Sequence, residues 1–361
     1  CATKDAMKFV GSDQPVRRIA IVRALHLGDM LCAVPALRSL RAGNADAEIT
    51  LIGLPWASEL SARLSSFVDV FVEFPGFPGI PERDVDCSRI AAFLQEMQAR
   101  RFDLAVQLHG SGSHINEFVA LLGASRMAAF CRVGDVMPGA EGYAVEWPAT
   151  GTEIERLLTL PLALGCPNTG STLALPVTDA DRAALAMLPG ATAITQLYVC
   201  LHPGARFRSR RWPAERFAAI GDAIAERGIT VVLTGTASER SITRAVGERM
   251  VADSVHLTGR LTLGTLAALV EGSALVVCND TGMSHVAAAV GAPSVVVSSG
   301  SDVSRWAPLD AKRNRVVWHD TSCRPCMHEV CPTAHECAIG VSVDDVVAQV
   351  DQLLPARAAY A

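Results

Sequence analysis

The 361-residue sequence has no apolar run near the ~20 residues of a membrane-spanning helix, so no segment is expected to cross a membrane. It also has no excess of positive charge, and its net charge of −5 argues against general binding to nucleic acid. Aromatic residues make up only 5% and charged residues 19%, whereas hydrophobic residues reach 50%, which excludes a disordered chain. The composition predicts a globular protein rich in Ala, Val and Leu.

Residues 1–15 are mixed and polar and lack the apolar segment of a secretory signal peptide. We therefore expect a cytoplasmic protein. A chain of this length exceeds the usual size of a single hydrophobic core, so two domains are expected.

No G-x-G-x-x-G follows the first predicted strand, at residues 17–23, so a dinucleotide fingerprint is missing there. Apolar β-branched runs nevertheless alternate with helical periodicity, which predicts an α/β fold with mostly parallel sheets covered by helices. Further strands are predicted at residues 48–54, 68–74, 102–108, 198–201, 229–233, 274–277 and 294–297, and helices at 30–40, 86–100, 153–164, 213–227, 238–250, 262–271, 286–293 and 342–354. The pattern weakens between residues 134 and 181, so we predict domains 1–178 and 179–361. Ligands of such sheets bind beyond the carboxyl ends of the strands, so Asp29 and His109 should face one cleft between the domains.

A strand-to-helix turn at Asp280, Thr281 and Gly282 is the most informative stretch of the sequence. An apolar strand precedes it, and a short helix follows that Gly291 and Pro293 should end. Backbone N–H groups and the positive end of the helix dipole favour a phosphate at such a turn. A capped helix without a ligand is the alternative interpretation.

Four of the eleven cysteines lie close together in one segment with the spacing C-x2-C-x4-C-x5-C. Such spacing suits a tetrahedral four-thiolate site for zinc or iron, and free thiols are the alternative. Disulfides are disfavoured in a reducing cytoplasm. The predicted ligands of this structural metal are Cys323, Cys326, Cys331 and Cys337.

Three motifs, in the same order along nearly the whole chain, resemble the ADP-heptose:lipopolysaccharide heptosyltransferases of glycosyltransferase family 9. The motifs are RALHLGD at residues 23–29 with PALR at 35–38, HPG at 202–204 before RRWP at 210–213, and DTGMSHVAAA at 280–289. The resemblance implies a GT-B fold of two Rossmann-like domains, with the nucleotide sugar bound mainly by the second.

The resemblance assigns a role to Asp29, because the matching residue in this family is the proposed catalytic base. Inverting transfer needs a base that removes the proton of the attacking hydroxyl. A helix cap for the segment from Met30 onward is the alternative interpretation of Asp29. His26 stands where relatives often carry Ser.

On the donor side, Arg210 matches a family Lys that contacts the pyrophosphate, and Glu239 matches a carboxylate that binds the nucleoside. Arg keeps the charge but changes the geometry of the contact. His285, one helical turn beyond Thr281, would face the phosphates. The alternative for the arginines of this loop is a solvated charge run. For Glu239 it is an ordinary residue in the first turn of a helix, and for His285 it is a core histidine. The implied nucleotide-sugar site consists of Gly204, Ala205, Arg210, Glu239, Leu261, Asp280, Thr281, Gly282 and His285.

The sequence therefore predicts an inverting glycosyltransferase that transfers heptose from ADP-heptose to a lipopolysaccharide inner-core acceptor, with no cofactor needed for catalysis. A lipid-linked acceptor implies peripheral contact with the inner membrane. Transfer to a protein or another glycan is the first alternative. A non-catalytic nucleotide-sugar-binding protein is the second.

Overall fold

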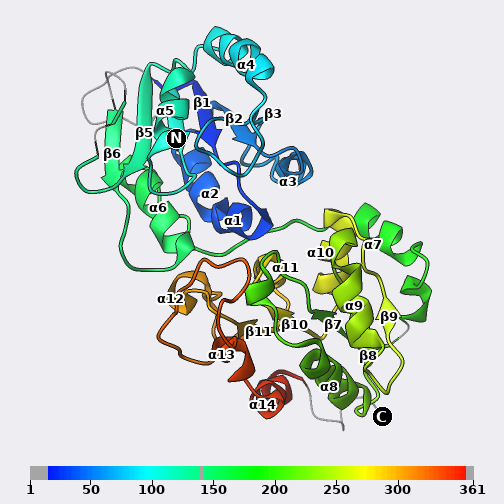
Figure 1. Ribbon diagram of the computed structural model, residues 1–361. Helices are drawn as coiled ribbons and strands as arrows, with labels where there is room; N and C mark the ends of the chain where they lie inside the picture. The colour runs from blue at the N-terminus through cyan, green and yellow to red at the C-terminus, as the bar shows by residue number, and fades with distance from the viewer. Residues whose placement is uncertain (1–14, 136, 139–141, 195, 355–361) are drawn as a thin grey trace. The chain divides into compact units, whose positions relative to one another are not determined.

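A computed structural model describes residues 15–135, 137–138, 142–194 and 196–354. The chain separates into two compact units between Leu173 and Ala174, five residues before the predicted boundary. Figure 1 shows that each unit consists of a sheet flanked by helices. Among the described residues, no helix has the length and apolar character that crossing a bilayer would require.

The first unit contains a parallel sheet of six strands in the order β3-β2-β1-β4-β5-β6. The first two crossovers therefore extend the sheet in one direction and the later ones in the other, which is the doubly wound Rossmann order. Its strands are β1 (Arg18–Val22), β2 (Glu48–Gly53), β3 (Val70–Glu73), β4 (Leu104–Gln107), β5 (Arg126–Cys131) and β6 (Gly142–Glu146). Its helices are α1 (Leu27–Cys32), α2 (Val34–Gly43), α3 (Ala57–Arg63), α4 (Cys87–Ala99), α5 (His114–Leu121) and α6 (Glu153–Ala163).

Alternation along β1 explains how this sheet is covered on both faces. Ala20 and Val22 point into a core cluster with Phe93 of α4 and Phe118 of α5. Phe74, just after β3, meets the Phe118 ring edge-on at 5.0 Å between centroids. Because both faces are buried, the central strands are nearly continuous apolar runs, which is why they could be predicted.

The second unit repeats the same topology, with strand order β12-β11-β10-β7-β8-β9, all parallel. Its strands are β7 (Tyr198–His202), β8 (Thr230–Leu233), β9 (Val255–His256), β10 (Leu275–Asn279), β11 (Ser294–Ser298) and β12 (Asn314–Trp318). Its helices are α7 (Asp179–Ala186), α8 (Ala214–Ala225), α9 (Arg240–Gly247), α10 (Leu263–Glu271), α11 (Gly282–Val290), α12 (Val303–Trp306), α13 (Glu336–Ile339) and α14 (Val343–Leu353), with 3-10 turns η1 (Ala191–Ala193), η2 (Arg208–Arg210) and η3 (Ala237–Glu239). The core of this unit is built around the fully buried Trp212 and Phe217, whose rings meet edge-on.

The predicted α/β class with two parallel sheets is confirmed, and the structure corrects several elements. Helix α1 begins at Leu27 rather than at the predicted Met30, so Gly28 and Asp29 lie inside the helix. A break at Ala33 divides the predicted helix into α1 and α2. The elements that the sequence did not predict are β5, β6, β9, β12, α3, α5, α7, α12, α13, η1 and η2.

Candidate functional site

Asp29 lies half-buried in the first turn of α1, directly after β1. The N-cap of this helix is His26, so the interpretation of Asp29 as a cap for a helix starting at Met30 is wrong. Instead, the backbone carbonyl of Asp29 accepts two hydrogen bonds from Arg23, from Nε at 2.9 Å and Nη2 at 2.6 Å. These two hydrogen bonds hold the backbone of Asp29 and do not involve its carboxylate.

Arg23 is an almost fully buried cation at the end of β1, with 1% of its surface exposed. It also donates to the carbonyl of Leu108, just after β4, and lies 3.6 Å from the carboxylate of Glu153. Glu153 is itself buried at the start of α6. A buried charge is tolerated when it is paired and hydrogen-bonded, so this set fixes the turn carrying Asp29 between β4 and α6.

In the second unit, β10 ends at Asn279 and α11 begins at Gly282, which confirms the predicted strand–turn–helix. The Thr281 Oγ1 accepts a hydrogen bond from the Met283 N–H at 3.4 Å and caps the helix. The helix ends at Val290, and its C-cap Gly291 has a left-handed φ of 76°. The first turn of a helix presents backbone N–H groups without intrahelical partners, so this turn suits an anion.

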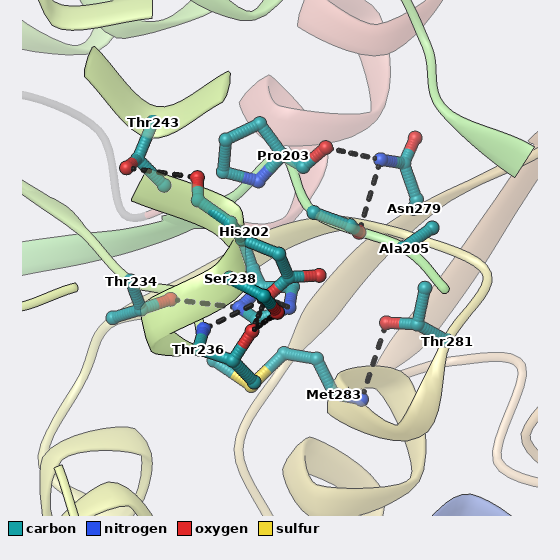
Figure 2. Close-up of polar contacts among 12 residues, drawn as sticks. His202, Pro203, Ala205, Thr234, Thr236, Ser238, Thr243, Asn279, Thr281 and Met283 are labelled. Carbon is teal, nitrogen blue, oxygen red and sulfur yellow. Dashed lines mark hydrogen bonds and ion pairs between the residues drawn. The ribbon is translucent and has the colours of Figure 1, made fainter. Parts of the chain in front are cut away.

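Asn279 ties this turn to the loop after β7 and was not assigned a role from the sequence. Its buried Nδ2 donates to the carbonyl of Pro203 at 2.8 Å, as Figure 2 shows, and to the carbonyl of Gly204 at 3.3 Å. Its Oδ1 accepts from the backbone N–H of Trp212 at 2.9 Å. A buried amide directly after an apolar strand was the available signal, because such a group must find several partners.

Asp280 points toward the end of β11, where its Oδ2 accepts hydrogen bonds from Ser301 and, at 3.5 Å, from Ser298. Burial raises the pKa of the Asp280 carboxyl, and the Ser301 hydroxyl and the nearby His285 and Arg210 oppose this effect. Thr281, not Asp280, caps the helix.

His285 is buried in α11, and its ring lies edge-on to Trp306 at 6.2 Å between centroids. The charge of His285 acts to lower the pKa of Asp280, so the two side chains lie close enough to interact. Leu261 is half-buried just before Thr262, the N-cap of α10. The structure thus brings His285 to Asp280.

Gly204, Ala205 and Glu239 meet at the ends of β7 and β8. The Glu239 Oε2 accepts from the Thr236 N–H at 2.7 Å and from its hydroxyl at 2.9 Å, so Glu239 closes a capping box (Figure 2). A Cβ added to Gly204 would lie 2.2 Å from the Glu239 Oε1, so a larger residue there would have to displace this carboxylate. The Ala205 carbonyl accepts a hydrogen bond from Arg211 at 2.9 Å.

Arg210 is half-buried, and its guanidinium contacts the segment that contains the cysteines. Its Nη1 donates to the carbonyl of Ser299 at 3.0 Å and lies 3.4 Å from the Cys326 Sγ, and its Nη2 donates to the Cys326 carbonyl. Arg208 is exposed. Arg208 and Arg210 therefore differ in environment, and of these two Arg210 is directed at the end of β11.

A second arginine, Arg324, reaches the same strand end and was missed from the sequence. It donates to the Ser298 carbonyl at 2.9 Å, the Ser298 hydroxyl at 3.1 Å and the Ser301 carbonyl at 2.9 Å. Burial lowers the pKa of Arg324. Arg324 thereby holds the segment whose hydroxyls bind Asp280.

The structure does not support the predicted metal centre at the four cysteines. Within the described ranges, no group of three or more His, Cys, Asp or Glu side chains is arranged to hold a metal ion. The prediction that Cys323, Cys326, Cys331 and Cys337 are four ligands of zinc or iron is therefore not supported. The thiols of Cys326 and Cys337 both lie beside Gly300. The segment also has other contacts, with Thr321 next to Cys323, Arg210 next to Cys326 and Thr333 next to Cys331, while Cys337 is buried.

Comparison with known proteins places these features in a family context. The family model described as "Glycosyltransferase family 9 (heptosyltransferase)" matches residues 144–336, more than half of the chain. Lipopolysaccharide heptosyltransferase 3 of Escherichia coli is 26% identical over 347 residues, which cover 91% of this chain and 96% of that protein. Other curated heptosyltransferases match over shorter stretches, and the chain spans 50% of one and 33% of another.

Two solved structures share the fold. A family 9 glycosyltransferase from Veillonella parvula superposes with a TM-score of 0.78 at 20% identity, covering 93% of this chain and 97% of that one. The E. coli ADP-heptose lipopolysaccharide heptosyltransferase II gives a TM-score of 0.72 at 19% identity, covering 93% and 98%. The two six-stranded units are thus the two Rossmann-like domains of a GT-B architecture. With its family model matched over more than half its length, the chain belongs to glycosyltransferase family 9, the heptosyltransferases.

Proposed function

We propose that the protein is an inverting glycosyltransferase that transfers heptose from ADP-heptose to an inner-core acceptor of lipopolysaccharide. The observation that carries this proposal is the β10–α11 turn, which Asn279 ties to the glycine-bearing loop after β7. That arrangement suits a nucleoside diphosphate, and the relatives' names identify heptose transfer to lipopolysaccharide as the activity of those proteins.

The proposed donor site lies in the second unit. The N–H groups of Thr281 and Gly282 would bind the pyrophosphate, and Glu239, with Gly204 against its carboxylate, would bind a ribose hydroxyl. Ala205 and Leu261 would line the nucleoside site, Asp280 would bind a hydroxyl of the sugar, and His285 would face the phosphates. Arg210 would supply a cation for the leaving ADP, which requires it to exchange a contact with Cys326 for a phosphate oxygen. With these groups, the proposed reaction needs no metal cofactor.

Asp29 in the first unit is the proposed catalytic base. Its carboxylate would take the proton of the acceptor hydroxyl while that oxygen attacks the anomeric carbon of heptose. The new C–O bond forms as the bond to the β-phosphate breaks, and ADP leaves with the bonding electrons. Attack from the face opposite the leaving group inverts the anomeric configuration. The fixed backbone of Asp29 supports this role because a base must be held in position.

A lipid-linked acceptor would bring the protein into peripheral contact with the cytoplasmic face of the inner membrane. Transfer to a protein serine or to another glycan uses the same chemistry and remains the alternative, because the donor-side residues do not choose the acceptor.

Incubation with ADP-heptose and a heptose-deficient lipopolysaccharide tests the proposal by mass spectrometry. We expect a product heavier by one heptose residue, with release of ADP. Release of ADP only with a protein or different glycan acceptor would favour the alternative. No transfer to any acceptor, despite binding of ADP-heptose, would contradict the proposed activity.

A further inference from the structure

The loop after β3 is folded tightly and carries a carboxylate, Glu82, that the proposed reaction does not use. Gly76 has a left-handed φ of 85°, and a Cβ there would lie 2.4 Å from the Asp84 carbonyl oxygen. Phe77 and Ile80 form an antiparallel bridge, and Ile80 is buried in the core of the first unit. The position of Glu82 is therefore set by the fold of the loop.

Glu82 contacts His109, which follows β4. The Glu82 Oε2 lies 3.6 Å from the His109 Nε2, and the His109 Nδ1 accepts a hydrogen bond from the Ala24 N–H at 3.1 Å. Because Nδ1 is the acceptor, the neutral ring carries its proton on Nε2, facing Glu82. Gln107 fixes the His109 turn by accepting its backbone N–H at 3.2 Å.

This cluster lies at the carboxyl ends of β1 and β4, where Asp29 also follows β1. Its carboxylate keeps a negative charge: burial acts to raise the pKa of Glu82, but the contacts with His109 and the charge of His26 outweigh it and lower the pKa. The arginines nearby already have partners. Arg83 binds Glu73 at 2.6 Å and the Phe74 carbonyl, and Arg23 binds Glu153.

We propose that Glu82, held by His109, recognises hydroxyl groups of an uncharged sugar on the acceptor and disfavours a phosphate or carboxylate at that place. This inference rests on the proposed function and specifies the substrate class of its acceptor side. A carboxylate accepts hydrogen bonds from hydroxyl groups, whereas an anionic substituent beside Glu82 would meet a like charge. Glu82 acts as a specificity-determining residue, separate from the base Asp29.

Two probes test the inference by calorimetry on the full chain: a methyl heptoside and the same compound carrying one phosphate. The wild type should bind the uncharged compound at least about tenfold more tightly. Glu82→Gln should weaken that binding by about 10- to 100-fold, the range for a hydrogen bond to a charged group, and reduce the discrimination against phosphate. The control Asp84→Asn, an exposed acidic residue of the same loop, should change neither value.

His109→Gln provides a second variant, in which the Glu82 side chain is unchanged but loses its contact with His109, so binding of the uncharged compound should fall less than in Glu82→Gln. ADP affinity should stay unchanged in every variant, since the proposed donor site lies in the other unit. Tighter binding of the phosphorylated compound by the wild type, or an unchanged ratio in Glu82→Gln, would overturn the inference. If the binding preference holds but ADP-heptose transfers no sugar to either compound or to lipopolysaccharide, the proposed function fails and the recognition site stands.

Discussion

Neutralising Glu153 tests whether burial, rather than distance, sets the strength of an ion pair in this protein. The Arg23–Glu153 pair is long at 3.6 Å, but its side chains are only 1% and 3% exposed. Removing one partner of a buried pair costs about 3–5 kcal/mol, because the other charge stays buried without compensation. Since Arg23 keeps its bonds to the carbonyls of Asp29 and Leu108, we expect Glu153→Gln to lose about 3 kcal/mol.

The matched control is Glu96→Gln in the same unit. Glu96 lies closer to its partner Arg100, at 2.9 Å, but the two side chains are 58% and 30% exposed. An exposed pair of this kind contributes less than about 1 kcal/mol. For a unit of this size, 1 kcal/mol corresponds to about 2–4 °C, so calorimetry should show a fall of roughly 6–12 °C for Glu153→Gln and almost none for Glu96→Gln.

An additional double variant separates the loss of the ion pair itself from the cost of leaving Arg23 as an uncompensated buried charge. Replacing both partners, with Arg23→Met and Glu153→Leu, should recover much of the stability, because no uncompensated charge remains in the core. Equal shifts for Glu153→Gln and Glu96→Gln, or a larger shift for Glu96→Gln, would refute the reasoning from burial.

Three further predictions concern the second unit. Arg210→Ala should weaken ADP binding by about 1.5–3 kcal/mol, the value of a charged hydrogen bond, and more than Arg208→Ala does; equal losses in calorimetry would indicate a diffuse basic patch. Because burial raises the pKa of Asp280, the stability linked to this group is present below about pH 3.8 and is lost as the pH rises through its folded-state pKa. Asp280→Asn should therefore be more stable relative to wild type at pH 7 than at pH 4, and a constant difference in melting temperature would contradict this. Contacts with Thr333 lower the pKa of Cys331, whereas burial raises the pKa of Cys200 to about 12. Iodoacetamide should therefore modify Cys331 before Cys200, and peptide mapping that finds the reverse order would contradict this prediction.

Much of the fold could be predicted because its central strands are buried on both faces. For the Val-rich segments β10 and β11, a strand is the secondary structure that fits their length and flanking turns. In contrast, β5 contains two adjacent alanines and lacks β-branched residues, and β6 is a largely exposed edge strand. Their positions depend on pairing with β4 and with each other, which local pattern does not encode.

The candidate site also has one part that could be predicted from the sequence and another that could not. The β10–α11 turn depends on local rules for capping and could be predicted, including the stop at Gly291. The direction of Arg210 could not, because it depends on Cys326, which lies 116 residues further along the chain. Asp29 shows the limit of local reasoning: the predicted helix began at Met30, whereas the helix starts at Leu27 and is supported by packing against α6.

The assignment of Asp29 as the base is tested most directly by comparing single-turnover transfer from ADP-heptose in the wild type and in Asp29→Asn, with ADP affinity measured on the same samples. Asn keeps the shape of the side chain and the Arg23 bonds to the backbone carbonyl, so the turn should remain intact. We predict a transfer rate lower by about 10²- to 10⁴-fold with ADP affinity unchanged, as expected for loss of a general base. A transfer rate within a few-fold of wild type would contradict the account, because proton removal would then not depend on Asp29.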